Sequence, residues 1–174
     1  MNFLEYVKGN NEGLLFIDKL RNTIKKISHD EMKEEFIGAT EEDIDKLSLM
    51  TEYNFFDGIT SDDSEWDLNT ITLEDVKFLV GSTIGFHKLC NAIEKNKRES
   101  YTEILYDVLY HLFSNVENVD ELFKSSKIVK EVYEKVEMIE SGEDEYHFGI
   151  FSDDELNQCI TDIYKSMIKD KIEI

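Results

Sequence analysis

The fold class is decided first by residues 100–113, which read SYTEILYDVLYHLF. Apolar side chains recur there every three or four residues, a spacing that places them on one side of a helix with 3.6 residues per turn. Ser100 precedes the run as a typical N-cap, and Glu103 stands where a capping box is closed. We therefore predict a helix over residues 101–113. Its apolar side would carry Tyr101, Ile104, Leu105, Val108, Leu109, Leu112 and Phe113.

Helical spacing extends to both sides of this stretch. A long helix is predicted over residues 119–141, ended by Gly142, and a last helix begins with the capping box Ser152–Glu155. Upstream, residues 11–27, two segments capped by Thr40 and Thr72, and the region of residues 86–93 have the same spacing. We expect a mainly α protein, a compact multi-helix single domain over residues 1–174 with about six or seven helices.

Other secondary structure is expected to be minor. Tyr146, Phe148 and Ile150 alternate with less apolar residues, and residues 68–71 are the candidate partner strand. At most one small β hairpin is therefore expected. Residues 57–70 form a long acidic, turn-rich connection, which we predict to be an acidic loop within the domain.

Negative charge is concentrated along the chain. Acidic residues outnumber lysine and arginine 39 to 19, for a net charge of -20. Three stretches without any lysine or arginine hold eight, six and nine acids; they lie between Lys46 and Lys77, Arg98 and Lys124, and Lys135 and Lys165. If these stretches share a face, that face attracts basic proteins and speeds their encounter. Direct nucleic-acid binding is not expected, because phosphate needs concentrated lysine and arginine.

The compartment is inferred from what the chain lacks. No basic, apolar leader opens the sequence, and no apolar run approaches the length of a membrane span. We expect a cytoplasmic protein that does not bind membranes. Cys90 and Cys159 each lie among apolar residues at helical spacing, which favours reduced, packed thiols over a disulfide.

The first candidate binding site is on the predicted helix over residues 101–113. Glu99, Glu103 and Asp107 recur every four residues, with Tyr106 and Tyr110 between them and the apolar side. Like charges at this spacing cost a helix about 0.2–0.5 kcal/mol per pair, so helix stability does not account for them. Binding of a basic partner does, with the tyrosines as anchors. The alternative is a solvated helix face.

The second candidate is the acidic loop. Trp66 is the only tryptophan and lies among acids, which again combines an anchor residue with charge. The alternative is that Trp66 folds into the core. A calcium loop starting at Asp63 fits poorly, because Leu68 stands where glycine is needed. The predicted partner-binding residues of this loop are Asp62, Asp63, Glu65, Trp66 and Asp67.

Catalytic and metal motifs are missing from the sequence. His87–Cys90 and Asp107–His111 each place two ligand types on one helix side, but a zinc site needs three or four. No phosphate loop, nucleophile elbow, His-Glu-x-x-His or Cys-x-x-Cys is present. Acids at residues 143–145 are predicted to form a solvated turn. We therefore expect no catalytic residues, no metal site, no cofactor and no enzyme activity.

These observations favour an acidic inhibitor that binds and occludes a basic protein, such as a toxin nuclease or a nucleic-acid-binding defence enzyme. Immunity proteins, antitoxins and phage-encoded antagonists such as anti-CRISPR proteins act in this way, some by imitating nucleic acid. That comparison rests on charge character alone. Two alternatives remain at this point: an assembly or adaptor module with apolar contacts, and a metal-dependent enzyme that uses the acid-rich loops.

Overall fold

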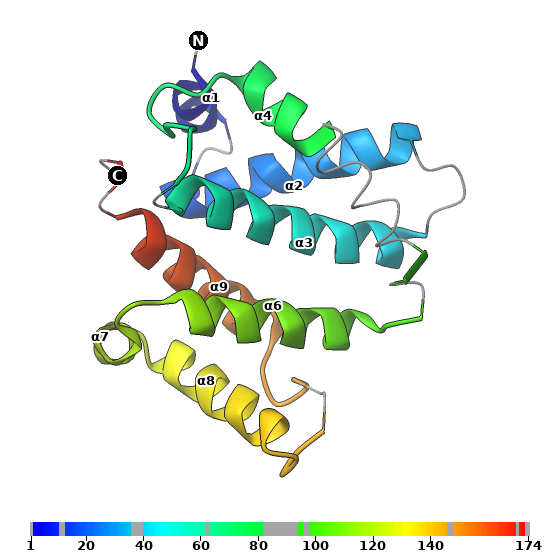
Figure 1. Ribbon diagram of the computed structural model, residues 1–174, viewed down its shortest axis with the longest axis vertical. Coiled ribbons are helices and arrows are strands. Elements are labelled where there is room, and N and C mark those ends of the chain that lie inside the picture. The colour runs from blue at the N-terminus through cyan, green and yellow to red at the C-terminus, as the bar shows by residue number, and fades with distance from the viewer. Residues whose placement is uncertain are drawn as a thin grey trace.

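Side-chain caps begin most helices in the computed structural model of the chain (Figure 1). The structure describes residues 2–10, 13–35, 40–61, 63–81, 94–95, 98–145, 148–169 and 171–172. The helices are α1 (Phe3–Gly9), α2 (Phe16–Glu35), α3 (Glu41–Thr60), α4 (Leu73–Gly81), α6 (Tyr101–Asn115), α7 (Val119–Ser125), α8 (Lys127–Glu140) and α9 (Asp153–Ile168). The protein is therefore a mainly α, compact single domain, as predicted.

The caps match the sequence signals closely. Thr40 and Ser152 each form complete capping boxes, with Asp43 and Glu155. The Thr72 hydroxyl accepts from the Asp75 N–H at 3.0 Å, and the Asp75 carboxylate accepts from the Thr72 N–H at 3.0 Å. Each pair satisfies two backbone donors that a helix start leaves open, which fixes where these helices begin.

The helices pack in layers around a central pair. In Figure 1, α2 and α3 lie side by side and antiparallel. Helices α1 and α4 lie on the side of α2 that faces away from α3. Helix α6 lies along the opposite side of α3, and α8 packs beneath α6. Helix α9 contacts α2, α3 and α8, so it joins both halves of the bundle. This arrangement leaves one side of α6 facing outward.

Aromatic side chains fill the centre of the core. The rings of Phe56 and Tyr164 are fully buried and stack with centroids 3.9 Å apart, which joins α3 to α9. Phe3 is equally buried and meets Phe55 edge to ring at 6.0 Å. Phe3 belongs to α1, a short helix that we did not predict from the sequence. The sequence signal was nevertheless present, because Asn2 and Glu5 form a capping box.

The predicted long helix over residues 119–141 is wrong in one respect, because it is two helices. Ser126 separates α7 from α8, and its hydroxyl accepts from the Val129 N–H as the N-cap of α8. The same hydroxyl donates to Asp162 of α9 at 2.6 Å. Apolar spacing continues through the break, so periodicity alone could not show it. Gly142, with a φ of 81°, follows the end of α8 as predicted.

Other boundaries also differ from the prediction. Helix α2 begins at Phe16 and continues to Glu35, well beyond residue 27. Helix α3 continues to Thr60, so residues 57–60 of the predicted acidic loop are helical. No helix in the described ranges is both long and apolar enough to cross a membrane. The helix predicted over residues 86–93, with His87 and Cys90, lies outside the described residues.

The predicted β hairpin does not form among the residues that the structure covers. In its place an isolated antiparallel bridge joins Asn2 to Thr72. Phe148 is buried at 4% exposure, whereas Ile150 is 67% exposed, so the two do not share one face as an alternating strand requires. Tyr146 and His147 lie outside the described residues.

Candidate interaction surface

Helix α6 carries two of the three acids that the sequence singled out. The Ser100 hydroxyl accepts from the Glu103 N–H at 3.2 Å and so fixes the start of the helix. Glu103 and Asp107 are both exposed, whereas Glu99 is half-buried just before the cap. The structure thus confirms that two of the three acids face outward from one side of α6.

The two tyrosines of α6 occupy different environments. Tyr106 is half-buried and packs against the core, whereas Tyr110 is 37% exposed. The centroids of their rings lie 6.2 Å apart and the rings are tilted, so the half-buried Tyr106 ring is next to the exposed Tyr110 ring. Tyr110 is therefore available as an anchor for a partner, and Tyr106 supports it.

Helix α3 adds residues to this surface that the sequence analysis did not select. The Asn115 side-chain amide donates to the Tyr53 hydroxyl at 3.0 Å and to the Asp57 carboxylate at 3.3 Å. The ring of Tyr53 lies 6.2 Å from that of His111. No periodicity within one helix could reveal this pairing. We call the α3–α6 surface the set Tyr53, Asp57, Glu103, Asp107, Tyr110, His111 and Asn115.

Charges on the α3–α6 surface influence one another. Partial desolvation raises the pKa of Asp107, and repulsion from Glu103 adds to it, against attraction from His111 and Lys95. Desolvation also raises the pKa of Tyr53, with Asp57 contributing. Desolvation is the main cause of both shifts and like-charge repulsion is the smaller one, so a positively charged partner group would relieve the repulsive part.

Further acids lie near the N-terminal end of α6, around Tyr101. Burial raises the pKa of the Tyr101 hydroxyl, and nearby Asp45, Glu52 and Asp153 raise it further. Asp45 belongs to α3 and Asp153 begins α9, so three helices contribute at this end. Tyr101 is 40% exposed, which makes it a second accessible aromatic side chain among carboxylates.

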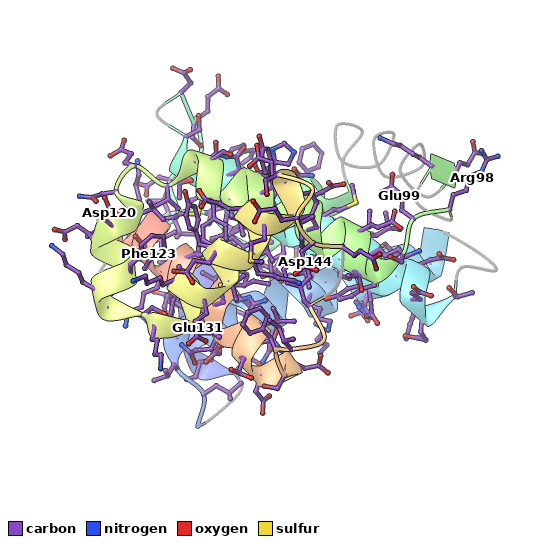
Figure 2. The ribbon with its side chains drawn as sticks, turned by 90° about the horizontal axis from the view of Figure 1, so that it is seen from below. Arg98, Glu99, Asp120, Phe123, Glu131 and Asp144 are labelled. Atoms are coloured by element: carbon purple, nitrogen blue, oxygen red, sulfur yellow. The ribbon has the colours of Figure 1, made fainter. Side chains whose placement is uncertain are left out.

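Acids from all three lysine-free stretches therefore border α6. Asp57 belongs to the stretch between Lys46 and Lys77, and Asp153 to the stretch between Lys135 and Lys165; both lie close to α6. Asp107 belongs to the remaining stretch and lies on α6 itself. Figure 2 shows Glu99 at one end of the molecule and Asp120 at the other, so the acids of residues 99–123 are spread along its length. Glu52 is an exception, because it is buried and does not contribute to the surface.

The acidic loop forms a separate surface. Trp66 is 38% exposed, so it is not the core residue of the alternative interpretation. Leu68 and Ile71 anchor the loop in the core instead. The Asp67 carboxylate accepts from the Asn69 N–H at 2.9 Å, so it is used within a turn. Asp63 and Glu65 are exposed, and Asp62 lies outside the described residues.

The loop starts next to Asp57 of the α3–α6 surface, where the Ser61 N–H donates to the Asp57 carbonyl at 3.0 Å, and then runs to other elements. Its downstream part is held to α1 and the C-terminal residues, since Asn69 Nδ2 donates to the Lys171 carbonyl at 2.8 Å and Phe3 N–H to the Ile71 carbonyl at 2.7 Å. The Trp66 N–H donates to the Ser64 hydroxyl at 3.2 Å, so this part of the loop is bonded within itself. The two predicted candidates are thus two surfaces.

Metal-ligand types do not gather anywhere in the part of the chain that the structure describes. There, no three His, Cys, Asp or Glu side chains are placed to hold one metal ion. Asp144, predicted to lie in a solvated turn, pairs with the buried Lys135 of α8. Cys159 is fully buried, as predicted, and burial raises the pKa of its thiol to about 12.

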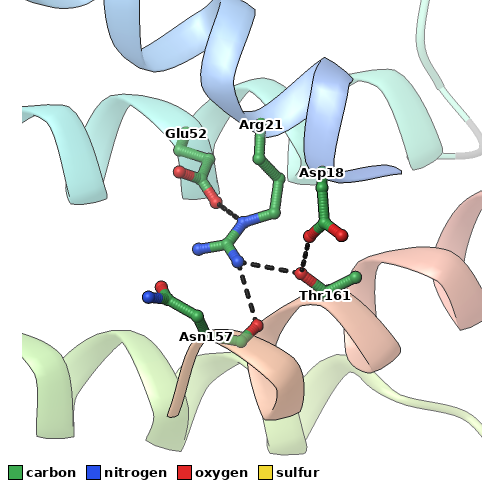
Figure 3. A network of polar contacts seen from close by, with 5 residues as sticks. All are labelled: Asp18, Arg21, Glu52, Asn157 and Thr161. Atoms are coloured by element: carbon green, nitrogen blue, oxygen red, sulfur yellow. Dashed lines mark hydrogen bonds and ion pairs between the residues drawn. The ribbon is translucent and has the colours of Figure 1, made fainter. Parts of the chain in front are cut away.

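A buried polar network joins α2, α3 and α9 (Figure 3). Arg21 Nε donates to Glu52 Oε1 at 2.6 Å, and Nη1 donates to Thr161 Oγ1 at 2.9 Å and to the Asn157 carbonyl at 3.0 Å. The Thr161 hydroxyl donates to Asp18 at 3.0 Å. Glu52 and Thr161 are each only 4% exposed, so this network is assigned to holding the helices together.

No family model, curated protein or solved structure matches this chain.

Proposed function

We propose that the protein is a stoichiometric inhibitor that uses the α3–α6 surface to bind and occlude a basic partner protein, such as a toxin nuclease or a nucleic-acid-binding defence enzyme. One observation carries the proposal: α3 and α6 pack side by side and together present the exposed carboxylates of Asp57, Glu103 and Asp107, and α6 adds the accessible ring of Tyr110. Long-range attraction and a desolvated anchor are the two components of tight binding by charged interfaces.

The size of the surface suits one interface. Helix α6 has 15 residues and is about 22 Å long at 1.5 Å per residue, whereas a standard interface of ~800 Å² per partner is about 30 Å across. Most of that width would be spanned by α6 and the adjoining face of α3. Residues 99–123 contain no lysine or arginine to oppose a basic partner.

The local electrostatics also support a cationic partner. Glu103 and Asp107 repel each other within the isolated protein, and the pKa of Asp107 is raised mainly by desolvation. An arginine or lysine placed between these carboxylates would replace repulsion by attraction in a partly desolvated setting. The rigid backbone of α6 holds both groups in place, which lowers the entropy lost on binding.

The test starts from capture of the partner from the lysate of the source organism, followed by affinity measurement with the purified partner. Charge reversal by Glu103→Lys with Asp107→Lys should weaken binding at least 100-fold, and Tyr110→Ala about 30-fold, since anchor residues cost ~2 kcal/mol or more. The native protein should also abolish the activity of the partner at a one-to-one ratio.

A matched control is available on α8. Glu134 and Glu137 are exposed acids on that helix, and their reversal to lysine changes the net charge by the same amount. The control should keep the affinity within threefold. A partner that binds both variants equally, or that remains active when saturated, contradicts the proposal. If the α6 and α8 charge-reversal variants lose the same affinity, binding depends on the net charge and not on the α3–α6 surface.

A further inference from the structure

An open groove of about 530 Å³ lies between α1, α2 and α4. Its volume falls within the range of roughly 300–1,000 Å³ that is common for small-ligand sites. In Figure 1 these three helices lie on the side of the bundle opposite to α6 and α8. The groove is therefore remote from the α3–α6 surface, and a role for it is independent of the proposed function.

The lining of this groove reverses the charge balance of the chain. Among the described residues that line it are Lys25, Lys26 and Lys77, and Asp30 is the one acid in that described set. Acids outnumber lysine and arginine 39 to 19 in the whole chain, so an average surface patch would hold about two acids per base. Three lysines against one acid make the groove a local positive site on an acidic protein.

These lysines are largely available. Among the described residues, no carboxylate lies within ion-pair distance of Lys25 or Lys26. Lys77 lies 3.9 Å from Glu74, but both side chains are exposed, so the pair is weak. His29 also lines the groove, but its Nε2 lies 3.3 Å from Asp45, and we do not count it as a free cation.

The remaining lining provides polar and apolar contacts. Tyr6 of α1, which is half-buried, and Asn22 of α2, which is exposed, also line the groove. Ile27 and Leu73 add apolar residues to the lining. Lysines that share a groove with a tyrosine and apolar residues match a phosphorylated compound with an organic part.

We propose that the groove between α1, α2 and α4 binds a small organic polyphosphate of the nucleoside triphosphate class. Lys25 and Lys26 from α2 and Lys77 from α4 pair with phosphate oxygens from two sides. The ring of Tyr6 and the side chain of Leu73 contact the organic part.

Titration calorimetry at low ionic strength tests this proposal with ATP and with inorganic tripolyphosphate as probes. Both should bind the native protein saturably, ATP more tightly because of its organic part. Lys26→Gln with Lys77→Gln should weaken both at least tenfold. The matched control, Lys130→Gln with Lys169→Gln, removes two charges from exposed lysines elsewhere and should change affinity less than twofold.

Protection from acetylation provides a second readout that needs no variant. ATP should slow modification of Lys25, Lys26 and Lys77, but not of Lys130, when the native protein is acetylated and digested for mass spectrometry. The proposal is overturned if neither probe shows saturable binding, if both double variants lose affinity equally, or if all four lysines are protected alike. The groove lies away from Glu103 and Asp107, so these outcomes are independent of partner binding.

Discussion

Arg21 and Glu52 form an ion pair within the core, where each charge depends on the other. Burial raises the pKa of Glu52, while the guanidinium of Arg21 lowers it. The Arg21 guanidinium carbon also lies 5.8 Å from the centroid of the Tyr164 ring, whose hydroxyl is buried. Buried pairs of this kind stabilise little overall, but loss of one partner leaves an uncompensated charge.

Arg21→Leu is therefore expected to lower the free energy of unfolding by about 3–5 kcal/mol, because the Glu52 carboxylate remains buried without its partner. The double variant Arg21→Leu with Glu52→Leu should recover at least half of that loss. Urea denaturation followed by circular dichroism measures both. If Arg21→Leu lowers the free energy of unfolding by no more than the double variant does, Arg21 and Glu52 are not coupled.

Asp107→Asn tests the electrostatics of the α3–α6 surface. The folded state raises the pKa of Asp107 above its unfolded value, so its contribution to stability is present at low pH and lost as pH rises through the folded pKa. The variant should thus match the native protein at pH 3 and be more stable at pH 7. Removal of one like-charge pair predicts a gain of about 0.2–0.5 kcal/mol.

Urea denaturation at the two pH values provides the comparison. Loss of stability at pH 7 would mean that the attraction between Asp107 and His111 outweighs desolvation and the repulsion from Glu103. A gain in stability together with weaker partner binding would indicate that Asp107 is retained for binding at the expense of the fold.

At the scale of elements, Ser126 decides how α7, α8 and α9 are arranged. Its hydroxyl caps α8 and donates to Asp162 of α9, and the residue is buried at 7% exposure. Ser126→Ala removes a cap, which costs ~1 kcal/mol, and leaves Asp162 with one donor fewer, so we expect a total loss of about 1–3 kcal/mol.

Its neighbour Ser125 is the matched control for this change. Ser125 is exposed, and its hydroxyl donates only to the Leu122 carbonyl at 3.1 Å. Ser125→Ala should change the free energy of unfolding by less than ~0.5 kcal/mol, as surface substitutions usually do. Equal effects at positions 125 and 126 in thermal or urea unfolding would contradict the role assigned to the Ser126 cap.

Elements differ in how well the sequence could predict them. The starts of α3, α4 and α9 were predictable, because a cap and the residue three positions later satisfy each other locally. The start of α6 was predictable from the Ser100 cap alone, since Glu103 does not close the predicted capping box. The break at Ser126 was not, since its hydroxyl is fixed by a carboxylate 36 residues away. Likewise, Tyr53 and Asp57 join the candidate surface only because α3 packs beside α6.

For the whole molecule, the net charge of -20 predicts a dependence on salt. Repulsion among the carboxylates destabilises the compact state, and its range shortens as the Debye length falls from about 30 Å at 0.01 M salt to about 10 Å at 0.1 M. The free energy of unfolding should therefore rise over this range.

Urea is the suitable denaturant for this measurement, because guanidinium is itself a salt. The dependence of the free energy on urea concentration should stay constant, since salt changes repulsion and not the surface exposed on unfolding. A fall in stability with added salt would show that attractive pairs such as Arg21–Glu52 and Lys135–Asp144 dominate the electrostatics of the folded state.

The sequence by itself determined the helical class, most helix starts and the acids and tyrosines of α6, because capping and apolar spacing act over a few residues. Tertiary structure decided which acids are on the surface: Glu52 is inside against Arg21, whereas Asp57 and Asp107 lie on neighbouring helices. It also gathered three lysines in one groove. These outcomes depend on which helices pack together, and packing is set by long-range contacts that no local pattern records.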